Sequence, residues 1–414
     1  MNNTPSSNRT HIGFFGRRNT GKSSLMNALI GQDYSIVSDV AGTTTDVVSR
    51  AFELQPVGPV VFHDTAGVDD EGELGLKRVS KTSQTLERCD LVLLVNDSDI
   101  SSPWEEMIVS ECKRMKKPFI NVRTKTDISP ENCTECKVDD YPYVSVCVPE
   151  KTGIEKLRSM IVGSVSRLSV DLPLVSDLVK PHSNVMLVIP IDREAPKGRL
   201  ILPQMQVMRE LLDSDVVFTV TKEQEIGYAL KDVLKDKPDL VITDSQVFLK
   251  VDGEVPPEIP LTGFSVLYAR AKGDLREYVA GLNAIDNLKE DSRILIAENC
   301  SHRPVSEDIG RVKIPRWLRQ YTGLNLNFDV RSGNDFPVDL SPYDLVIQCG
   351  GCMVNRQLVV SRIQKCRDFK VPVTNYGLTI AFLHGIIRRA LSVFPDVLEE
   401  YLENQEKLGT GRQG

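Results

Sequence analysis

Short apolar runs alternate with longer amphipathic stretches along the chain, a pattern typical of βαβ units with parallel sheets. In the first part, buried strands are predicted at residues 11–15, 60–62, 119–122 and 144–147, and a helical pattern covers 24–30. These strands are separated by segments long enough for crossover helices. The pattern predicts an α/β fold for this part of the chain.

The same alternation resumes beyond a proline-containing boundary near residues 170–181. Strands are expected at 184–191, 216–220 and 239–243, with helices at 204–212 and 222–234. After a second linker at 255–257, strands are expected at 264–269, 293–297, 345–347 and 372–374, with helices at 274–288, 306–321, 355–369 and 379–391. We therefore predict an α/β protein with three domains, at residues 1–170, 171–258 and 259–414, of which the last two are smaller and Rossmann-like.

Composition narrows the class of protein. The chain has 414 residues and 41% apolar residues, which is ordinary for a globular protein of several domains. Its net charge of −7 argues against a nucleic-acid surface, and no apolar run is long enough to span a membrane. The polar N-terminus does not resemble a signal peptide, and nine cysteines fit a reducing cytoplasm.

A complete phosphate-loop motif follows the first strand. The segment 16–23 reads GRRNTGKS and opens the predicted helix. Glycines let backbone amides surround phosphates, the lysine reaches the terminal phosphates, and the serine binds Mg²⁺. The residues expected to contact the nucleotide here are Gly16, Asn19, Thr20, Gly21, Lys22, Ser23 and Ser24.

Later segments indicate that the nucleotide is GTP. Asp64 and Gly67, in the sequence DTAG, come after a strand, where an acidic side chain can hold Mg²⁺ and an amide can meet the γ-phosphate. Thr44 lies in a segment that suits a magnesium-binding switch. The base would be read by Lys125, Asp127 and Ser145. We expect Lys22, Thr44, Asp64 and Gly67 to be catalytic, with Mg²⁺ on Ser23, Thr44 and Asp64.

In order and spacing these motifs resemble the translation-factor-like GTPases, particularly the MnmE/Era branch. Thr124 stands where that family usually has asparagine, which should weaken the link between the base-reading loop and the phosphate loop. Val68 stands where other GTPases place a water-orienting glutamine. The resemblance implies that a K⁺ ion bound by Asn19 takes the place of an arginine finger in these GTPases. It also implies that intrinsic GTP turnover is slow.

A second group of candidate functional residues lies in the last third of the chain. Cys300 and His302 follow one predicted strand, and Cys349 and Cys352 follow another. Thiolates and an imidazole at the carboxyl ends of α/β strands indicate a metal site, with zinc and an iron–sulfur cluster as the alternatives. The remaining cysteines are interpreted as exposed thiols (Cys133, Cys136) or packing residues (Cys89, Cys112, Cys147), and His384 as a packed histidine.

Taken together, the motifs resemble the HydF family of iron-only (FeFe) hydrogenase maturation. The resemblance is carried by 16–23, 64–70, 240–246, 272–275, 298–302, 307–315 and 349–352. It implies a 4Fe-4S cluster held by Cys300, Cys349 and Cys352. Gln348 replaces a histidine of the family pattern, which leaves the fourth iron to His302, Glu298 or water.

The resemblance also implies the function. The protein would be a GTPase and scaffold that holds a diiron precursor and delivers it to apo iron-only hydrogenase. Radical-SAM maturases would be separate partners, and the chain would form a homodimer or a higher oligomer. Two alternatives remain: a GTP-regulated metalloenzyme with an open-site cluster, and a tRNA-modifying GTPase of the MnmE type, which the acidic balance disfavours.

Overall fold

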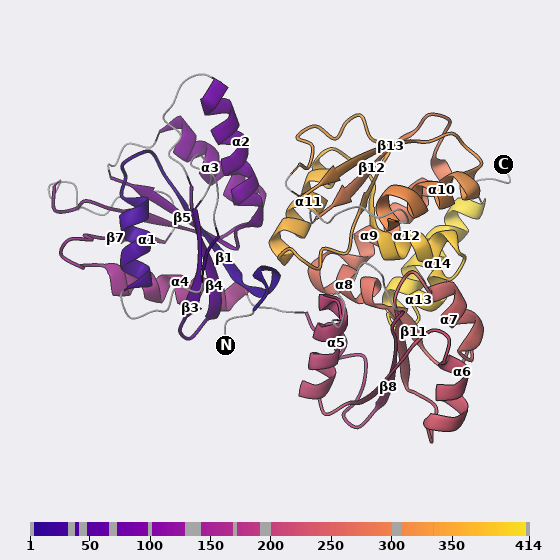
Figure 1. Cartoon of the computed structure of the whole chain (residues 1–414). Coiled ribbons are helices and arrows are strands. Elements are labelled where there is room, and N and C mark those ends of the chain that lie inside the picture. Colours follow the sequence, from indigo (N-terminus) through magenta and orange to yellow (C-terminus); the bar gives the residue numbers. More distant parts are fainter. Residues whose placement is uncertain are drawn as a thin grey trace. The chain divides into compact units, whose positions relative to one another are not determined.

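The computed structural model describes residues 4–31, 38–40, 48–65, 73–97, 102–128, 142–168, 172–190, 200–299, 308–333 and 335–410. The chain divides into two compact units, Met1–Val170 and Asp171–Gly414 (Figure 1). Each is an α/β unit with parallel strands, so the predicted fold class is confirmed. Among the helices of these ranges, none has the length and apolarity needed to cross a membrane.

The first unit contains a seven-stranded sheet in the order β2-β3-β4-β1-β5-β6-β7. Its strands are β1 (Thr10–Phe15), β2 (Ser38–Val40), β3 (Val48–Leu54), β4 (Gly58–Asp64), β5 (Leu91–Asn96), β6 (Phe119–Arg123) and β7 (Tyr143–Ser145). All neighbours pair in parallel except β2 with β3 and β3 with β4. The parallel strands bring the segments that follow β1, β4 and β6 to one edge of the sheet.

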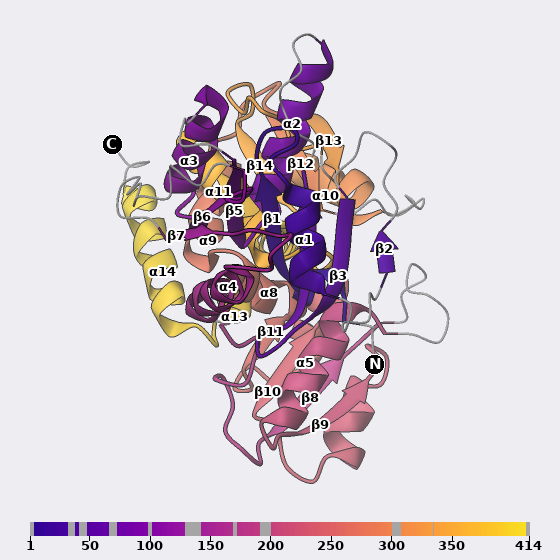
Figure 2. The same cartoon turned by 90° about the vertical axis from the view of Figure 1, so that its left-hand side faces the viewer.

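Helices cover both faces of this sheet (Figures 1 and 2). They are α1 (Lys22–Ile30), α2 (Glu73–Arg88), α3 (Pro103–Arg114) and α4 (Ile154–Leu168). Leu25 of α1 and Leu157 of α4 share one core with Ile12 of β1, whereas Leu86 of α2 and Ile108 of α3 share the other core. Strands β1 and β5 are thus buried on both faces, which explains their nearly continuous apolar sequences.

The second unit contains two parallel four-stranded sheets, β11-β10-β8-β9 and β13-β12-β14-β15. The strands are β8 (Asn184–Val188), β9 (Val217–Thr221), β10 (Leu240–Thr243), β11 (Leu261–Gly263), β12 (Arg293–Glu298), β13 (Asn327–Ser332), β14 (Leu345–Gln348) and β15 (Val373–Asn375). The helices are α5 (Leu202–Asp213), α6 (Ile226–Tyr228), α7 (Phe248–Glu254), α8 (Phe264–Lys272), α9 (Leu275–Gly281), α10 (Ile314–Thr322), α11 (Arg356–Asp368), α12 (Tyr376–Leu383), α13 (Ile387–Ala390) and α14 (Pro395–Thr410). One continuous apolar core joins both sheets.

Two predicted elements are wrong. Residues 264–269, expected to be a strand, form helix α8, which is buried on most of its sides and therefore shows no amphipathic period. The helix expected at 379–391 is divided into α12 and α13, because Gly385 adopts a φ of 74° between them. In the second unit, strands β11 and β13 and helices α7 and α14 were not predicted. In the first unit, the prediction missed strands β2, β3 and β5 and helices α2, α3 and α4.

Candidate functional site

The phosphate loop begins where β1 ends and closes at the start of α1. A Cβ added to Gly16 would lie 2.1 Å from the carbonyl oxygen of Val95, so only glycine fits there. Asn19 and Gly21 adopt positive φ angles of 61° and 88°. These conformations turn the loop sharply into the amino end of α1, and the amino end of a helix is a favourable place for a phosphate to bind.

Lys22 is buried within this loop, with 6% of its surface exposed. Its Nζ donates hydrogen bonds to the carbonyl oxygens of Gly16 at 2.8 Å and Arg17 at 2.6 Å. The lysine therefore spans the loop, in the position from which a nucleotide phosphate can be met.

Ser23 and Asp64 come together although they are 41 residues apart. The Ser23 hydroxyl donates a hydrogen bond to a carboxylate oxygen of Asp64. Burial raises the pKa of Asp64, and the bond to Ser23 and the charge of Lys22 oppose that rise. A hydroxyl and a carboxylate are oxygen ligands of the kind that Mg²⁺ prefers. The other predicted residues of this group, Thr44 and Gly67, lie outside the described residues.

The segment that is predicted to read the base is tied to the phosphate loop. The hydroxyl of Thr124 lies within hydrogen-bond distance of the Thr20 carbonyl and, at 3.1 Å, of the Asn96 carbonyl. Thr124 thus keeps a direct link to the phosphate loop despite its short side chain. Lys125 pairs with Asp97 at 3.0 Å, and Arg17 of the phosphate loop approaches Asp97 at 3.4 Å.

A cavity of about 480 Å³ lies over these residues. It is lined by Arg18, Asn19, Gly21, Lys22, Ser23, Ser24, Val48, Asp64, Thr65 and Lys125. Asp127 is exposed and follows β6, and Ser145 ends β7 beside Arg123 of β6. Most of the described residues that are predicted to bind phosphate and Mg²⁺ therefore line one cavity, together with Lys125. The other two residues predicted to read the base, Asp127 and Ser145, lie at the ends of adjacent strands.

Cys349 lies directly after β14, at the carboxyl edge of the second unit's second sheet. Its Sγ accepts hydrogen bonds from the backbone N–H of Asn299 at 3.0 Å and from Asn299 Nδ2 at 3.2 Å. Arg362, which is 2% exposed, donates to Asn299 Oδ1 and orients that amide. These two contacts hold the Cys349 sulfur in place at the carboxyl end of β14, where it can bind a metal group.

Cys352 lies in a turn that starts with Gly351, which has a φ of 66°, and that is closed by a hydrogen bond from the Val354 N–H to the Gly351 carbonyl oxygen. Burial raises the pKa of the Cys352 thiol, and the negative charge of Cys349 adds to that effect. Lys272 lies against the same turn, and burial lowers its pKa to about 8. Both described thiols are partly exposed and free, so the pair can accept a metal group.

The remaining predicted metal ligands are only partly described. Cys300 and His302 lie outside the described residues, and within the described ranges no three candidate ligands are close enough to hold a metal ion. Glu298 is buried, and Arg311 contacts both of its carboxylate oxygens, at 3.0 and 2.7 Å. The Ser332 hydroxyl donates to the same carboxylate at 2.7 Å. Iron binding at Glu298 would have to displace these contacts.

Other predictions concern residues away from both sites. Cys89, Cys112 and Cys147 are buried packing residues, as predicted. The His384 ring packs edge-on against Trp317 with 4.9 Å between ring centroids, again as predicted. Cys133 and Cys136 lie outside the described residues.

Sequence reasoning missed the residues that hold the cysteines. Asn299 and Lys272 fall within segments that carried the family resemblance. Their contacts with Cys349 and Cys352 could not be predicted from the sequence. Nothing in the sequence pointed to Arg362, which reads as an ordinary polar position of a helix.

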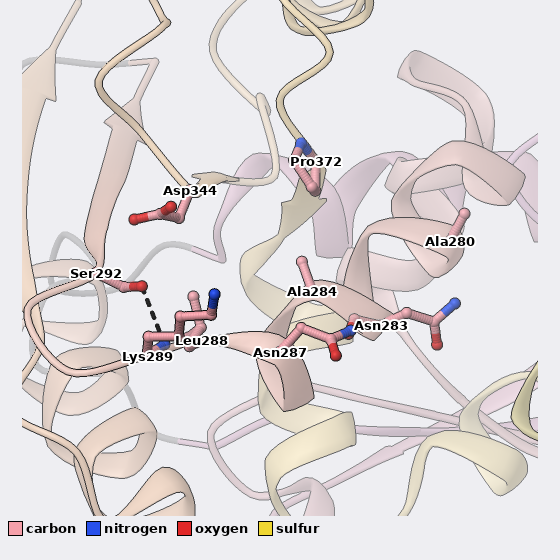
Figure 3. Close-up of a pocket in the computed structure, with 9 residues that line it drawn as sticks. All are labelled: Ala280, Asn283, Ala284, Asn287, Leu288, Lys289, Ser292, Asp344 and Pro372. Atoms are coloured by element: carbon pink, nitrogen blue, oxygen red, sulfur yellow. Dashed lines mark hydrogen bonds between the residues drawn. The ribbon is translucent and has the colours of Figure 1, made fainter. Parts of the chain in front are cut away.

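A second cavity, of about 470 Å³, lies at the amino-terminal edge of the sheet β13-β12-β14-β15, opposite to the edge that carries Cys349 (Figure 3). Ser292 and Asp344 line it just before β12 and β14, and the backbone N–H of Lys289 donates to Ser292 Oγ at 3.1 Å. No thiol or imidazole is among its lining residues. We assign it no chemistry.

Family models match most of the chain. A hydrogen maturase F dimerization domain matches residues 174–273 and a hydrogen maturase F tetramerization domain matches 276–393. A 50S ribosome-binding GTPase domain matches residues 11–125. The two maturase models together account for more than half of the chain.

Individual relatives match a smaller part. The tRNA modification GTPase MnmE of Chromobacterium violaceum is 35% identical over 162 residues, which is 39% of this chain and 36% of that protein. GTPase Der of Kosmotoga olearia is 27% identical over 207 residues, which is 46% of this chain and 46% of that protein. The chain thus spans less than half the length of these relatives.

Among solved structures, Era of Aquifex aeolicus is 20% identical and covers 51% of this chain and 92% of its own, with a TM-score of 0.31. The G domain of the T. maritima FeoB iron transporter is 23% identical and covers 38% of this chain and 98% of its own, with a TM-score of 0.29.

Proposed function

Because the chain belongs to the hydrogen maturase F family, we propose that it is a GTPase and scaffold that holds a 4Fe-4S cluster and a diiron precursor and delivers the precursor to apo iron-only hydrogenase. The observation that carries the proposal is the Cys349–Cys352 pair at the carboxyl edge of a sheet, on a chain that also has a complete phosphate-loop site. A scaffold regulated by GTP needs both sites on one polypeptide.

The donor set fits an iron–sulfur cluster. Cys349 already receives two N–H hydrogen bonds on its sulfur, and such bonds tune clusters that thiolates hold. Cys300, Cys349 and Cys352 would hold the cluster, which supplies an iron with an exchangeable position when bound. Because Arg311 and Ser332 engage Glu298, we assign the fourth position to His302 or water rather than to Glu298.

In the first unit, Lys22 would bind the terminal phosphates of GTP, and Ser23, Thr44 and Asp64 would bind Mg²⁺. The Gly67 amide would meet the γ-phosphate. Lys125, Asp127 and Ser145 would read guanine. We assign GTP hydrolysis a gating role in the exchange of partner proteins rather than a part in cluster chemistry.

The organisation proposed for the protein follows from these roles. Residues 1–170 would bind GTP, 171–258 would form a dimer and 259–414 would bind the cluster. Radical-SAM maturases would supply the diiron precursor, and no nucleic acid or membrane would take part. Reduced thiols are required throughout, which places the protein in a cytoplasmic environment.

The cluster is tested by anaerobic reconstitution with iron and sulfide, followed by EPR of the reduced protein. We expect a 4Fe-4S signal that changes when imidazole or cyanide is added, and we expect C349S and C352S to lose it while keeping GTP binding. Tight zinc binding without a cluster would contradict the scaffold. Turnover of a small substrate by the isolated protein would favour a metalloenzyme instead.

Potassium dependence is tested separately on the nucleotide site. Phosphate release from GTP should be slow in NaCl and faster in KCl, because a bound K⁺ ion can stabilise charge that develops on the phosphates. N19A should lose the difference between the two salts, whereas N27A, on the helix beyond the loop, should keep it. Equal rates of wild-type protein in both salts would remove the potassium role and leave GTP hydrolysis standing.

A further inference from the structure

Lys272 is the last residue of α8, and its side chain enters the turn that carries Cys352. Its Nζ donates hydrogen bonds to the carbonyl oxygens of Val354 at 2.8 Å, Gly351 at 3.3 Å and Cys352 at 3.4 Å. A lysine ammonium has three protons to donate. All of them are directed at one short turn, so a cation from a separate helix holds the Cys352 end of the pair.

This ammonium has no carboxylate partner within 4.0 Å among the residues that the structure describes. Its other close neighbour is the ring of Tyr268, with Nζ 5.4 Å from the ring centroid. Burying a cation without an anion costs free energy. Nζ lies 3.3 Å from the Gly351 carbonyl oxygen and 3.4 Å from the Cys352 carbonyl oxygen, so the lysine is placed to balance an anion bound at the cysteines.

Cys349 is held in a different way. Its sulfur receives hydrogen bonds from Asn299, and the buried Arg362 contacts Asn299 and the carbonyl oxygen of Gly333. Arg362 thus acts on Cys349 through the Asn299 amide. Lys272, in contrast, contacts the cysteine turn directly.

We propose that Lys272 is a positioning residue for the anionic iron–sulfur group, which fixes the Cys352 turn and supplies the positive charge that stabilises the reduced cluster. The inference rests on the cluster-binding function proposed above. Reduction by one electron from dithionite adds one negative charge to the cluster, and a fixed cation nearby makes that electron easier to accept. Removal of the cation should move the midpoint potential to a more negative value.

The test compares full-length K272M and K272R with the wild-type protein after anaerobic reconstitution. Methionine has a similar length without the charge, and arginine keeps the charge. Iron and sulfide contents are measured first, and the midpoint potential is then obtained by dithionite titration followed by EPR. We expect a more negative potential for K272M and a potential close to wild type for K272R.

K289M provides the matched control, because it removes the same charge from an exposed lysine at the opposite edge of the same sheet (Figure 3). Its potential should equal that of the wild type. A shift in K289M as large as that in K272M would assign the effect to net charge and overturn the proposal.

The remaining outcomes are also decisive. An unchanged potential in K272M, or equal shifts in K272M and K272R, would overturn the role of the charge. If K272M holds no cluster, a wild-type cluster in K272R supports the proposal, and loss of the cluster in both variants counts against it. Failure of the wild-type protein to form any cluster would contradict both the scaffold function and this inference. A cluster in the wild-type protein, with the same content and midpoint potential in the variants, would contradict this inference alone.

Discussion

Thr124 shows how a departure from a family motif can be compensated within one side chain. The sequence predicted a weaker link between the base-reading segment and the phosphate loop, because Thr124 stands where the family usually has asparagine. In the structure the hydroxyl of Thr124 is buried and bonds to the Thr20 carbonyl, so the link is made. The backbone segments evidently approach each other closely enough for the shorter side chain to reach.

Replacing Thr124 with valine should weaken nucleotide binding, because valine keeps the shape and removes the hydroxyl donor. Loss of one buried hydrogen bond costs about 1 kcal/mol, or roughly a five-fold rise in the Kd for GDP. Titration with a fluorescent GDP analogue measures this. T124S should bind GDP as the wild type does, and T126V, two residues along the chain, should leave the Kd unchanged. An unaltered Kd for T124V would show that the Thr20 contact does not support the site.

A second feature at the residue scale is a buried pair of histidines in the first sheet. His11 Nδ1 lies 2.8 Å from His63 Nε2, and His63 Nδ1 lies 2.8 Å from the Ser49 hydroxyl. His11 Nε2 must donate to the Ser6 carbonyl oxygen, at 2.9 Å, because that oxygen can only accept. This assigns the protons in the whole series of hydrogen bonds. His63 Nε2 donates to His11 Nδ1, the Ser49 hydroxyl donates to His63 Nδ1, and both rings are neutral.

This neutral pair should make the stability of the first unit depend on pH. Burial lowers the pKa of His11 to about 4 and that of His63 well below its usual value. Above pH 6.5 both rings are neutral in the folded and unfolded chains. As pH falls from about 6.5 toward 4, the two histidines bind protons in the unfolded chain but not in the folded unit. The free energy of unfolding therefore falls, by about 3 kcal/mol at pH 4 for His11 alone.

Urea unfolding of the full chain between pH 7 and pH 5 measures this loss. The double variant H11Q/H63Q keeps hydrogen-bonding side chains that do not titrate, so its stability should change less with pH. H182N, at an exposed histidine, should keep the wild-type pH dependence. A double variant with the wild-type slope would exclude the pair as its source.

At the scale of elements, the sequence predicted those strands and helices whose burial follows a simple rule. Strands such as β1 and β14 are buried on both faces and read as continuous apolar runs. Helix α8 has no such signature, because its buried residues Phe264, Val266, Leu267, Tyr268 and Ala269 leave it without a polar stripe. The sequence of α8 is rich in residues that also suit strands, and only packing between the two sheets decides in favour of a helix.

The candidate sites divide in the same way. The phosphate-loop residues and the cysteine pair could be predicted because their chemistry requires fixed residue types at fixed spacing. Lys272, Asn299 and Arg362 could not, since each acts through a contact that forms only when distant elements meet. Asp97, which joins Lys125 to Arg17, was missed for the same reason.

Helices α8 and α12 approach each other more closely than ordinary side chains permit. A Cβ added to Gly377 of α12 would lie 1.8 Å from Ser265 Oγ of α8, and that hydroxyl bonds to Ser245 Oγ at 2.6 Å. Asn375 Nδ2 also donates to the Ser265 carbonyl oxygen at 3.2 Å. The contact therefore joins α12 to the end of β10 through α8.

G377A should destabilise the second unit, because the new methyl group must separate α8 from α12. Overpacking of this kind typically costs about 1–3 kcal/mol. G253A is the matched control: Gly253 lies in α7 with nothing within 4 Å of an added Cβ, and alanine there should be neutral or stabilising by up to about 1 kcal/mol. Thermal unfolding of both variants gives the comparison. Equal stability of G377A and the wild type would show that this contact is not tightly packed.

At the scale of the whole molecule, the second unit carries matches to a dimerization and a tetramerization domain, which supports oligomer formation. Strand β9 lies at an edge of the sheet β11-β10-β8-β9. Val217 and Val220 of β9 are 65% and 45% exposed, and the neighbouring α5 exposes Met205 and Leu212. An exposed apolar edge strand is a surface that commonly pairs with another chain.

We therefore expect the dimer to form along β9, and V220K to weaken it by placing a charge on the edge that two chains would share. Size-exclusion chromatography with light scattering over a range of concentrations should show dissociation at a higher concentration for V220K than for the wild type. M107K is the control, because Met107 is a half-exposed apolar residue of α3 in the first unit. Both variants should keep GTP binding, since neither residue lines the nucleotide cavity. If V220K assembles as the wild type does, the dimer must use another surface, and the exposed residues of β9 would then need a different explanation.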